Sequence, residues 1–181
     1  RVKNVHFWPF WTQDKRIIEY TIANGATFMF QRTDWEVVED IFCWGYNTGV
    51  EFSSSEAPRE HPGLKGINGM NGQMTNINFD NVNVGVDIRG TQPYAIHITN
   101  LNIANAGAGE DHIGIWGRNS VKSAELSVRG ASFWGSLNQA LRWEIPGTVT
   151  LADSRVVEWN HRLPAVELLA GKAMVHDVVF A

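Results

Sequence analysis

The sequence predicts an all-β fold of the parallel solenoid class, in which short strands wind around a common axis. Three observations predict this fold: a six-residue pattern recurs along the chain, its third position always holds Asn, Asp or Gly, and helical periodicity is almost absent. The chain has 181 residues, which is enough to enclose a substantial core. We therefore expect one solenoid domain that spans residues 1–181.

Composition excludes several classes of protein. Hydrophobic residues make up 44% of the chain and charged residues 19%, a balance that argues against disorder. Cys43 is the single cysteine, which excludes an internal disulfide and a multi-cysteine zinc site. No apolar stretch approaches the roughly 20 residues of a membrane-spanning helix. The formal charge is −4 and basic residues do not cluster. We therefore predict no nucleic-acid partner and no membrane partner.

The recurring pattern reads apolar, any residue, turn residue, small or apolar, any residue, apolar, and it begins at residues 2–7. Asn, Asp and Gly tolerate a left-handed backbone better than other residues, so the third position predicts a tight bend between two strands. The only helical segment expected is a short turn over residues 16–23. The third positions of the seven copies are Asn4, Asp40, Asn81, Asn100, Gly130, Asp153 and Asp177.

A second run of three residues, apolar, variable, apolar, follows most copies of the pattern after a loop. Copies lie about 25–30 residues apart, the size of one solenoid turn with two or three short strands. Alternation then points the apolar residues inward and the middle residue outward. An antiparallel sandwich also has many short strands and is the alternative. The second runs are residues 50–52, 86–88, 113–115, 141–143 and 166–168, and loop insertions are expected around residues 8–27, 53–73 and 104–111.

The Asn-rich bends, the variable loops before each Val-x-Ile strand and the coil length resemble the right-handed parallel β-helix of the pectin-lyase-like superfamily, which includes pectate lyases and polygalacturonases. The resemblance covers nearly the whole chain and implies about six to seven right-handed coils. It also implies stacked Asn side chains at the bend between the second and third strands, and a carbohydrate groove along the first strands. Asn4, Asn81 and Asn100 match that bend, whereas Gly130 would interrupt the amide ladder.

Both ends of the chain carry partial copies of the pattern, at residues 1–7 and 175–180, so we expect both ends to lie inside coils. The end of a solenoid exposes unpaired backbone groups and is normally capped. No amphipathic capping helix is visible at either terminus. We therefore expect the ends to be covered by further coils of a longer chain or by partners, including copies of the same chain in a homo-oligomer.

Stacking of the second runs would align their outward residues in columns with a spacing of about 4.8 Å. Glu51 and Asp87 would then lie side by side and repel each other, so that one holds a proton and the two serve as acid and base in glycosidic cleavage. An ion pair with Arg89 or Arg142 is the structural alternative. One predicted column holds Glu51, Asp87, Gly114, Arg142 and Glu167, and the next holds Ser53, Arg89, Trp116, Glu144 and Leu169.

The remaining candidate residues would bind the substrate. Arg89, His112 and Arg142 would orient a sugar or its carboxylate, Glu144 would line the same face, and Trp116 would stack on a sugar ring. Together with the acid–base pair, these residues predict an acidic groove that binds a polysaccharide.

Three functions are compatible with this groove. The first is a glycoside hydrolase that acts on an extracellular glycan, although the Gly-His-Gly motif of the superfamily hydrolases is absent. The second is a non-catalytic glycan-binding or structural module, such as a segment of a surface or phage adhesin. The third is a uronate polysaccharide lyase, for which the resemblance implies Ca²⁺ bound by acidic residues such as Glu51 and Asp87. No other cofactor or metal is predicted, and an extracellular or cell-surface location follows from the substrate class alone.

Overall fold

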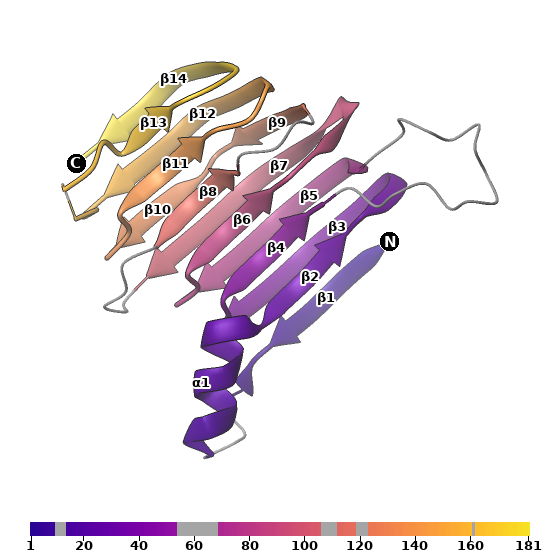
Figure 1. Ribbon diagram of the computed structural model, residues 1–181, viewed down its shortest axis with the longest axis vertical. Coiled ribbons are helices and arrows are strands. Elements are labelled where there is room, and N and C mark those ends of the chain that lie inside the picture. Colours follow the sequence, from indigo (N-terminus) through magenta and orange to yellow (C-terminus); the bar gives the residue numbers. More distant parts are fainter. Residues whose placement is uncertain (10–13, 54–68, 106–111, 119–122, 161) are drawn as a thin grey trace.

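The computed structural model describes residues 1–9, 14–53, 69–105, 112–118, 123–160 and 162–181. These residues form a mostly β structure in which every strand pairing is parallel, as Figure 1 shows. The alternative of an antiparallel sandwich is therefore wrong, and the predicted parallel solenoid is confirmed. The expected helical turn is α1 (Lys15–Asn24), which begins after the N-cap Asp14. No helix in the described ranges is both long and apolar enough to span a bilayer.

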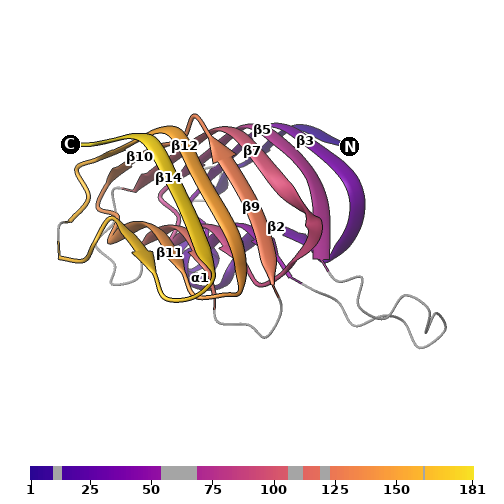
Figure 2. The same cartoon turned by 90° about the horizontal axis from the view of Figure 1, so that it is seen from above.

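Two parallel sheets run along the solenoid, and the chain alternates between them (Figure 2). The first sheet has eight strands, and its strands are curved. Neighbouring strands stack so that equivalent residues of successive coils lie side by side. The strands of this sheet are β1 (Val2–Phe7), β3 (Arg32–Trp44), β5 (Gly69–Asp80), β7 (Thr91–Asn105), β9 (Ala124–Arg129), β10 (Ser132–Gly135), β12 (Gly147–Val157) and β14 (Lys172–Phe180).

The second sheet contains the predicted apolar, variable, apolar runs. Its six strands delimit five complete turns. The solenoid therefore has about five turns and not the six to seven predicted, because β1 and β14 belong to incomplete outer turns. The strands of this sheet are β2 (Ala26–Phe30), β4 (Thr48–Phe52), β6 (Val84–Ile88), β8 (Ile113–Gly117), β11 (Gln139–Trp143) and β13 (Val166–Leu168).

The predicted loop insertions fall mainly between these strands. The segment 8–27 contains α1 as well as loop, and β5 begins at Gly69, inside the predicted insertion 53–73. Residues 54–68 and 106–111, which hold most of the other two insertions, lie outside the described residues.

The core is a set of apolar columns between the two sheets. The column that contains Cys43, for example, continues through Phe79 and Ile103 in the next two coils. Cys43 is fully buried and accepts a hydrogen bond from Thr27 Oγ1 at 2.9 Å. Burial raises the pKa of its thiol to about 12, because a thiolate would lose its hydration there.

The recurring bends have the predicted left-handed backbone. The register of the first sheet aligns one residue of each coil in a column, and the φ angles along this column lie between 50° and 67°. We call it the left-handed column. Its members are Asn4, Asp40, Asn76, Asn100, Gly130, Asp153 and Asp177.

The prediction that Asn81 belongs to this column is wrong. Asn81 does have a left-handed backbone, with φ 52°, but it lies at a different bend, between β5 and β6. Asn76 occupies the column instead, within residues 74–79, which fit the same six-residue pattern. The two candidate copies share Phe79, so the pattern alone could not choose between them.

The predicted amide ladder runs along part of the left-handed column. Asn76 Nδ2 donates to Asp40 Oδ1 at 2.9 Å, and Asn100 Nδ2 donates to Asn76 Oδ1 at 2.8 Å. Gly130 has no side chain to continue the ladder, as predicted. A shallow hollow of about 600 Å³ opens at this position. It is lined by Asn102, Gly130, Ala131, Ser132, Asp153, Ser154, Arg155, Asp177 and Val179.

The substitution Gly130→Asn tests this account of the ladder. A Cβ at Gly130 would meet only the backbone nitrogen of Asn100, at 3.8 Å, so the position has room for a side chain. Asn tolerates the left-handed backbone, restricts the unfolded chain and can join the ladder, so we expect stabilisation of about 0.5–1 kcal/mol. Gly130→Ala is the matched control, and its strained φ should destabilise the protein by about 1 kcal/mol. Urea denaturation measures both, and equal effects of the two substitutions would contradict the ladder.

Candidate functional site

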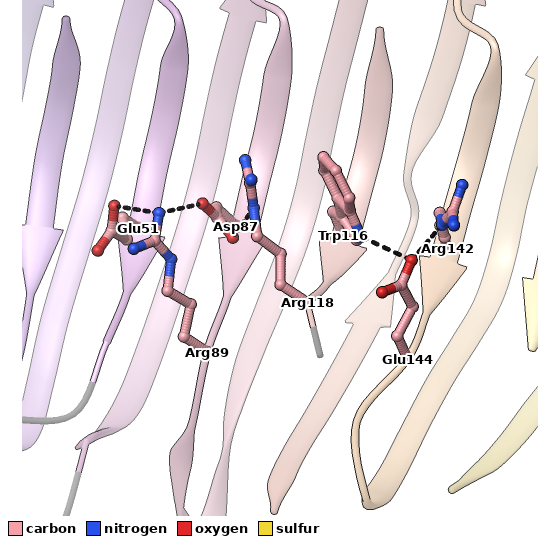
Figure 3. Close-up of polar contacts among 7 residues, drawn as sticks. All are labelled: Glu51, Asp87, Arg89, Trp116, Arg118, Arg142 and Glu144. Carbon is pink, nitrogen blue, oxygen red and sulfur yellow. Dashed lines mark hydrogen bonds and ion pairs between the residues drawn. The ribbon is translucent and has the colours of Figure 1, made fainter. Parts of the chain in front are cut away.

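The candidate residues lie on the outward face of the second sheet, near the ends of β4, β6, β8 and β11 (Figure 3). Glu51 is the register partner of Asp87, and the column continues outward-facing through Trp116, Arg142 and Glu167. The predicted pairing of Glu51 with Asp87 is therefore confirmed. We call the residues of this face the charged row, which comprises Glu51, Asp87, Arg89, Trp116, Arg118, Arg142 and Glu144.

The register of β8 differs from the prediction by two residues. Trp116, and not Gly114, is the partner of Asp87, because Ile113 pairs with Val84 and not with Val86. A shift of two residues keeps the inward and outward faces unchanged, since side chains alternate with a period of two. The alternating pattern of the strand therefore could not reveal the shift.

Arg89 lies between the two carboxylates of the predicted acid–base pair. Its Nη2 is 3.1 Å from Glu51 Oε2 and 3.0 Å from Asp87 Oδ2. Burial by itself would lower the pKa of the Arg89 guanidinium, but the hydrogen bond to Asp87 and the charges of Asp87 and Glu51 raise it overall. The structural alternative, an ion pair with Arg89, is thus realised in the geometry.

Asp87 is held by a second arginine. Arg118 Nε lies 2.9 Å from Asp87 Oδ1, so each carboxylate oxygen of Asp87 has a guanidinium partner. Asp87 has 0% of its surface exposed and Glu51 has 8%. The predicted acidic groove is therefore wrong in its charge pattern, because carboxylates and guanidiniums alternate along this face and neutralise each other.

Trp116 points outward, as predicted, but lies between two arginines. The Arg118 guanidinium is 4.0 Å from the indole centroid and that of Arg142 is 5.7 Å away. The indole Nε1 donates to Glu144 Oε1 at 3.3 Å, and Arg142 Nε contacts the same oxygen. Cation–π contacts thus occupy the ring on which a sugar was expected to stack.

The structure does not bring His112 to the charged row. His112 immediately precedes β8, whereas Trp116 lies near the other end of that strand, and His112 is buried. The prediction that it faces the groove is wrong, because His112 is buried where the chain enters β8, and its carbonyl accepts a hydrogen bond at 2.7 Å from the backbone N–H of Asn138 in the neighbouring coil.

An exposed aromatic pair on the first sheet was missed from the sequence. The rings of Trp35 and Tyr94 have centroids 5.8 Å apart and are tilted by 37°. Trp35 is 71% exposed and Tyr94 is 68% exposed. The register shifts between Thr33 and Glu36, and this bulge turns the indole of Trp35 outward. We call these two residues the aromatic pair.

A buried polar network supports the aromatic pair. Asn71 Oδ1 accepts a hydrogen bond from the backbone N–H of Trp35 at 2.7 Å, and Asn71 Nδ2 donates to Gln92 Oε1 at 2.8 Å. Gln92 Nε2 donates in turn to Asp34 Oδ1 at 2.6 Å. Asn71 and Gln92 are both buried, so the network is fixed in position.

The network holds a strained backbone. Trp35 has φ 55° and Ala95, next to Tyr94, has φ 68°, a region that costs roughly 1–2 kcal/mol for an ordinary residue. Such strain persists only where the surroundings enforce it, and it gathers at binding sites. Pro93 is the sequence signal that could have located this site, since a proline inside a strand marks an edge or a bulge.

Metal ligands do not gather in the part of the chain that the structure describes. No group of three or more His, Cys, Asp or Glu side chains among those residues is arranged to hold a metal ion. The two carboxylates proposed as Ca²⁺ ligands share Arg89 as their partner instead.

Comparison with known proteins assigns no family. No protein-family profile, no curated protein and no solved structure matches the chain.

The substitution Asp87→Asn measures the structural role of the charged row. It removes a buried charge that neutralises two arginines, so we expect the free energy of unfolding to fall by about 2 kcal/mol. Asp153→Asn is the matched control, because Asp153 is exposed and its ion pair with Arg129 spans 3.4 Å, so its loss should change stability by less than about 0.5 kcal/mol. Denaturant titration measures both, and equal stabilities would contradict the pairing.

Proposed function

We propose that this protein is a non-catalytic glycan-binding solenoid and that it binds a polysaccharide at the aromatic pair. The observation that carries the proposal is the exposure of Trp35 and Tyr94 side by side on a rigid, strained bulge. Large aromatic side chains are normally buried in the core or covered by a partner. Two adjacent rings that are exposed to water therefore mark a candidate ligand-binding surface. A preformed pair of ring faces also loses little entropy when a ligand binds.

A sugar suits this pair better than a purely apolar ligand. The C–H face of a pyranose stacks on aromatic rings, while its hydroxyl groups need hydrogen-bonding partners nearby. Exposed Gln73 and His97 follow on the same strands, β5 and β7, and are register partners of each other. The resemblance of the Asn-rich bends to the pectin-lyase-like superfamily supports a polysaccharide as the ligand class, and with it an extracellular or cell-surface location.

The charged row supports binding without cleavage. A general acid or base has to reach the glycosidic oxygen or a water molecule with a free carboxyl oxygen. Both oxygens of Asp87 contact guanidiniums, and Arg89 also engages Glu51. The hydrolase and lyase functions therefore receive less support than the binding function.

The double substitution Trp35→Ala with Tyr94→Ala tests the proposal. Binding is measured on a panel of neutral and uronic-acid polysaccharides, and the release of reducing ends and of unsaturated products is measured in parallel. We expect the wild type to bind at least one polysaccharide without forming product. The double variant should bind it at least about tenfold more weakly, which corresponds to about 1.4 kcal/mol of lost stacking.

Trp134→Ala is the matched control, because Trp134 is also exposed but lies in β10, away from the aromatic pair. It should bind like the wild type. Unchanged binding by the double variant would refute the aromatic pair as the site. If the wild type releases product and Glu51→Gln does not, the non-catalytic function is refuted and Glu51 and Asp87 are supported as an acid–base pair.

A further inference from the structure

We infer that the ligand of the aromatic pair is positively charged, and that it is a polysaccharide with free amino groups. This inference rests on the proposed function, since it names the class of glycan that the same site binds. The comparison of two tryptophans leads to it. Trp116 and Trp35 each lie near carboxylates, but in the described part of the chain only Trp116 has cationic side chains against its ring.

At Trp116 the chain brings together an indole ring, a cation against the face of that ring and a carboxylate that pairs with the cation. The Arg118 guanidinium lies 4.0 Å from the indole centroid, while Arg118 Nε lies 2.9 Å from Asp87 Oδ1. The face of an indole is electron-rich and attracts a cation, and a carboxylate nearby adds to this attraction. The charged row thus shows which third group an indole and a carboxylate attract.

The aromatic pair also combines an indole with a carboxylate. Asp34 immediately precedes Trp35 in β3, and its side chain is exposed. Asp34 Oδ1 accepts hydrogen bonds from Gln92 Nε2 at 2.6 Å and from Asn71 Nδ2 at 3.3 Å. Because Gln92 lies two residues before Tyr94, these bonds fix the carboxylate between the two chain segments that carry the rings.

A second carboxylate lies beside the bulge of β7 that carries Tyr94. This bulge extends from Thr91 to Ile96 in the register with β5. The backbone N–H of Glu125 donates to Thr91 Oγ1 at 2.8 Å, and the next residue, Leu126, is the register partner of Ile96. Glu125 therefore borders the bulge on the side opposite β5.

These two carboxylates are not neutralised by the residues that the structure describes. Most other acidic residues in the same ranges form ion pairs. No ion pair there involves Asp34 or Glu125, and the basic residues on the strands of the two rings, Arg32 and His97, form none either. The surface around the aromatic pair therefore favours a cationic ligand and disfavours an anionic one.

A polysaccharide with protonated amino groups satisfies both parts of this surface. The C–H face of its sugar can stack on the rings of the aromatic pair, while an ammonium group supplies the cation and hydrogen-bond donors for a carboxylate. An N-acetylated sugar keeps the stacking face but carries no charge, and a uronate carries a charge of the wrong sign. The amino polysaccharide is therefore the glycan class that this site fits best.

Calorimetric titration with short oligomers of glucosamine and of N-acetylglucosamine, matched in length, tests the inference. The titrations are run at a mildly acidic pH, at which the amine of glucosamine is protonated. We expect the wild type to bind the free-amine oligomer about tenfold more tightly, and added salt should reduce this preference.

Equal affinity for the two oligomers, with both affinities lost in the double variant Trp35→Ala with Tyr94→Ala, would overturn the inference and leave the proposed function intact. No binding of either oligomer would also overturn it, and binding to the polysaccharide panel would then decide the proposed function separately.

Asp34→Asn isolates the contribution of the charge, because an amide oxygen can still accept the hydrogen bonds from Gln92 and Asn71. We expect its affinity for the free-amine oligomer to fall about threefold, while its affinity for the N-acetylated oligomer stays unchanged. Glu125→Gln should reduce the same preference and keeps the test open if Asp34→Asn fails to fold.

Glu158→Gln is the matched control. Glu158 also has no ion pair in the described ranges, but it follows the end of β12, whereas the aromatic pair lies near the beginnings of β3 and β7. It should show the wild-type preference. A preference that stays unchanged in both Asp34→Asn and Glu125→Gln, or that falls equally in Glu158→Gln, would overturn the inference.

Discussion

One left-handed residue in each coil is the constraint on which this solenoid depends. The bend at that residue turns the chain between two segments of the first sheet while the next side chain still reaches the core. A residue with a Cβ and no local hydrogen-bonding group would add strain at every coil. Asn and Asp meet this demand, and from Asp40 to Asn100 their side chains also bond from coil to coil, so the bend fixes the register as well as the turn.

The strict register explains why the charged row has become an internally neutral surface. Parallel strands bring side chains of successive coils to about 4.8 Å, so two adjacent carboxylates repel strongly unless a cation lies between them. Arg89 supplies that cation for Glu51 and Asp87. The spacing that would allow an acid–base pair therefore also attracts a guanidinium, and the guanidinium is what the structure contains.

The aromatic pair arises where the regular register is broken. Bulges in β3 and β7 displace the chain, and a buried Asn–Gln–Asp network holds the displaced backbone in place. A solenoid offers flat and repetitive faces, so a local irregularity is where a distinctive binding surface can form. This separates the two features physically: the charged row follows from regular stacking, and the aromatic pair follows from its interruption.

The sequence predicted the fold because the bends restrict residue type so strongly, and six of seven bend positions were identified correctly. Asn81 was chosen over Asn76 because both fit the pattern. The spacings of 36 residues from Asp40 to Asn76 and 24 from Asn76 to Asn100 are too uneven to choose between them without a structure. The pairing of Glu51 with Asp87 was predictable, because both are the middle residue of an apolar, variable, apolar run. The two-residue register shift at Trp116 was not predictable, since it preserves the alternation of inward and outward side chains. The outward turn of Trp35 was not predictable either, since it depends on a bulge.

Nuclear Overhauser effects between coils test the central claim most directly, because they report which strands are neighbours and in which direction they run. The account predicts contacts in parallel register between residues 24 positions apart, as between Asn76 and Asn100, together with left-handed backbone chemical shifts at both. Close Hα–Hα contacts across paired strands, which are typical of antiparallel sheets, would contradict the solenoid and every column derived from it.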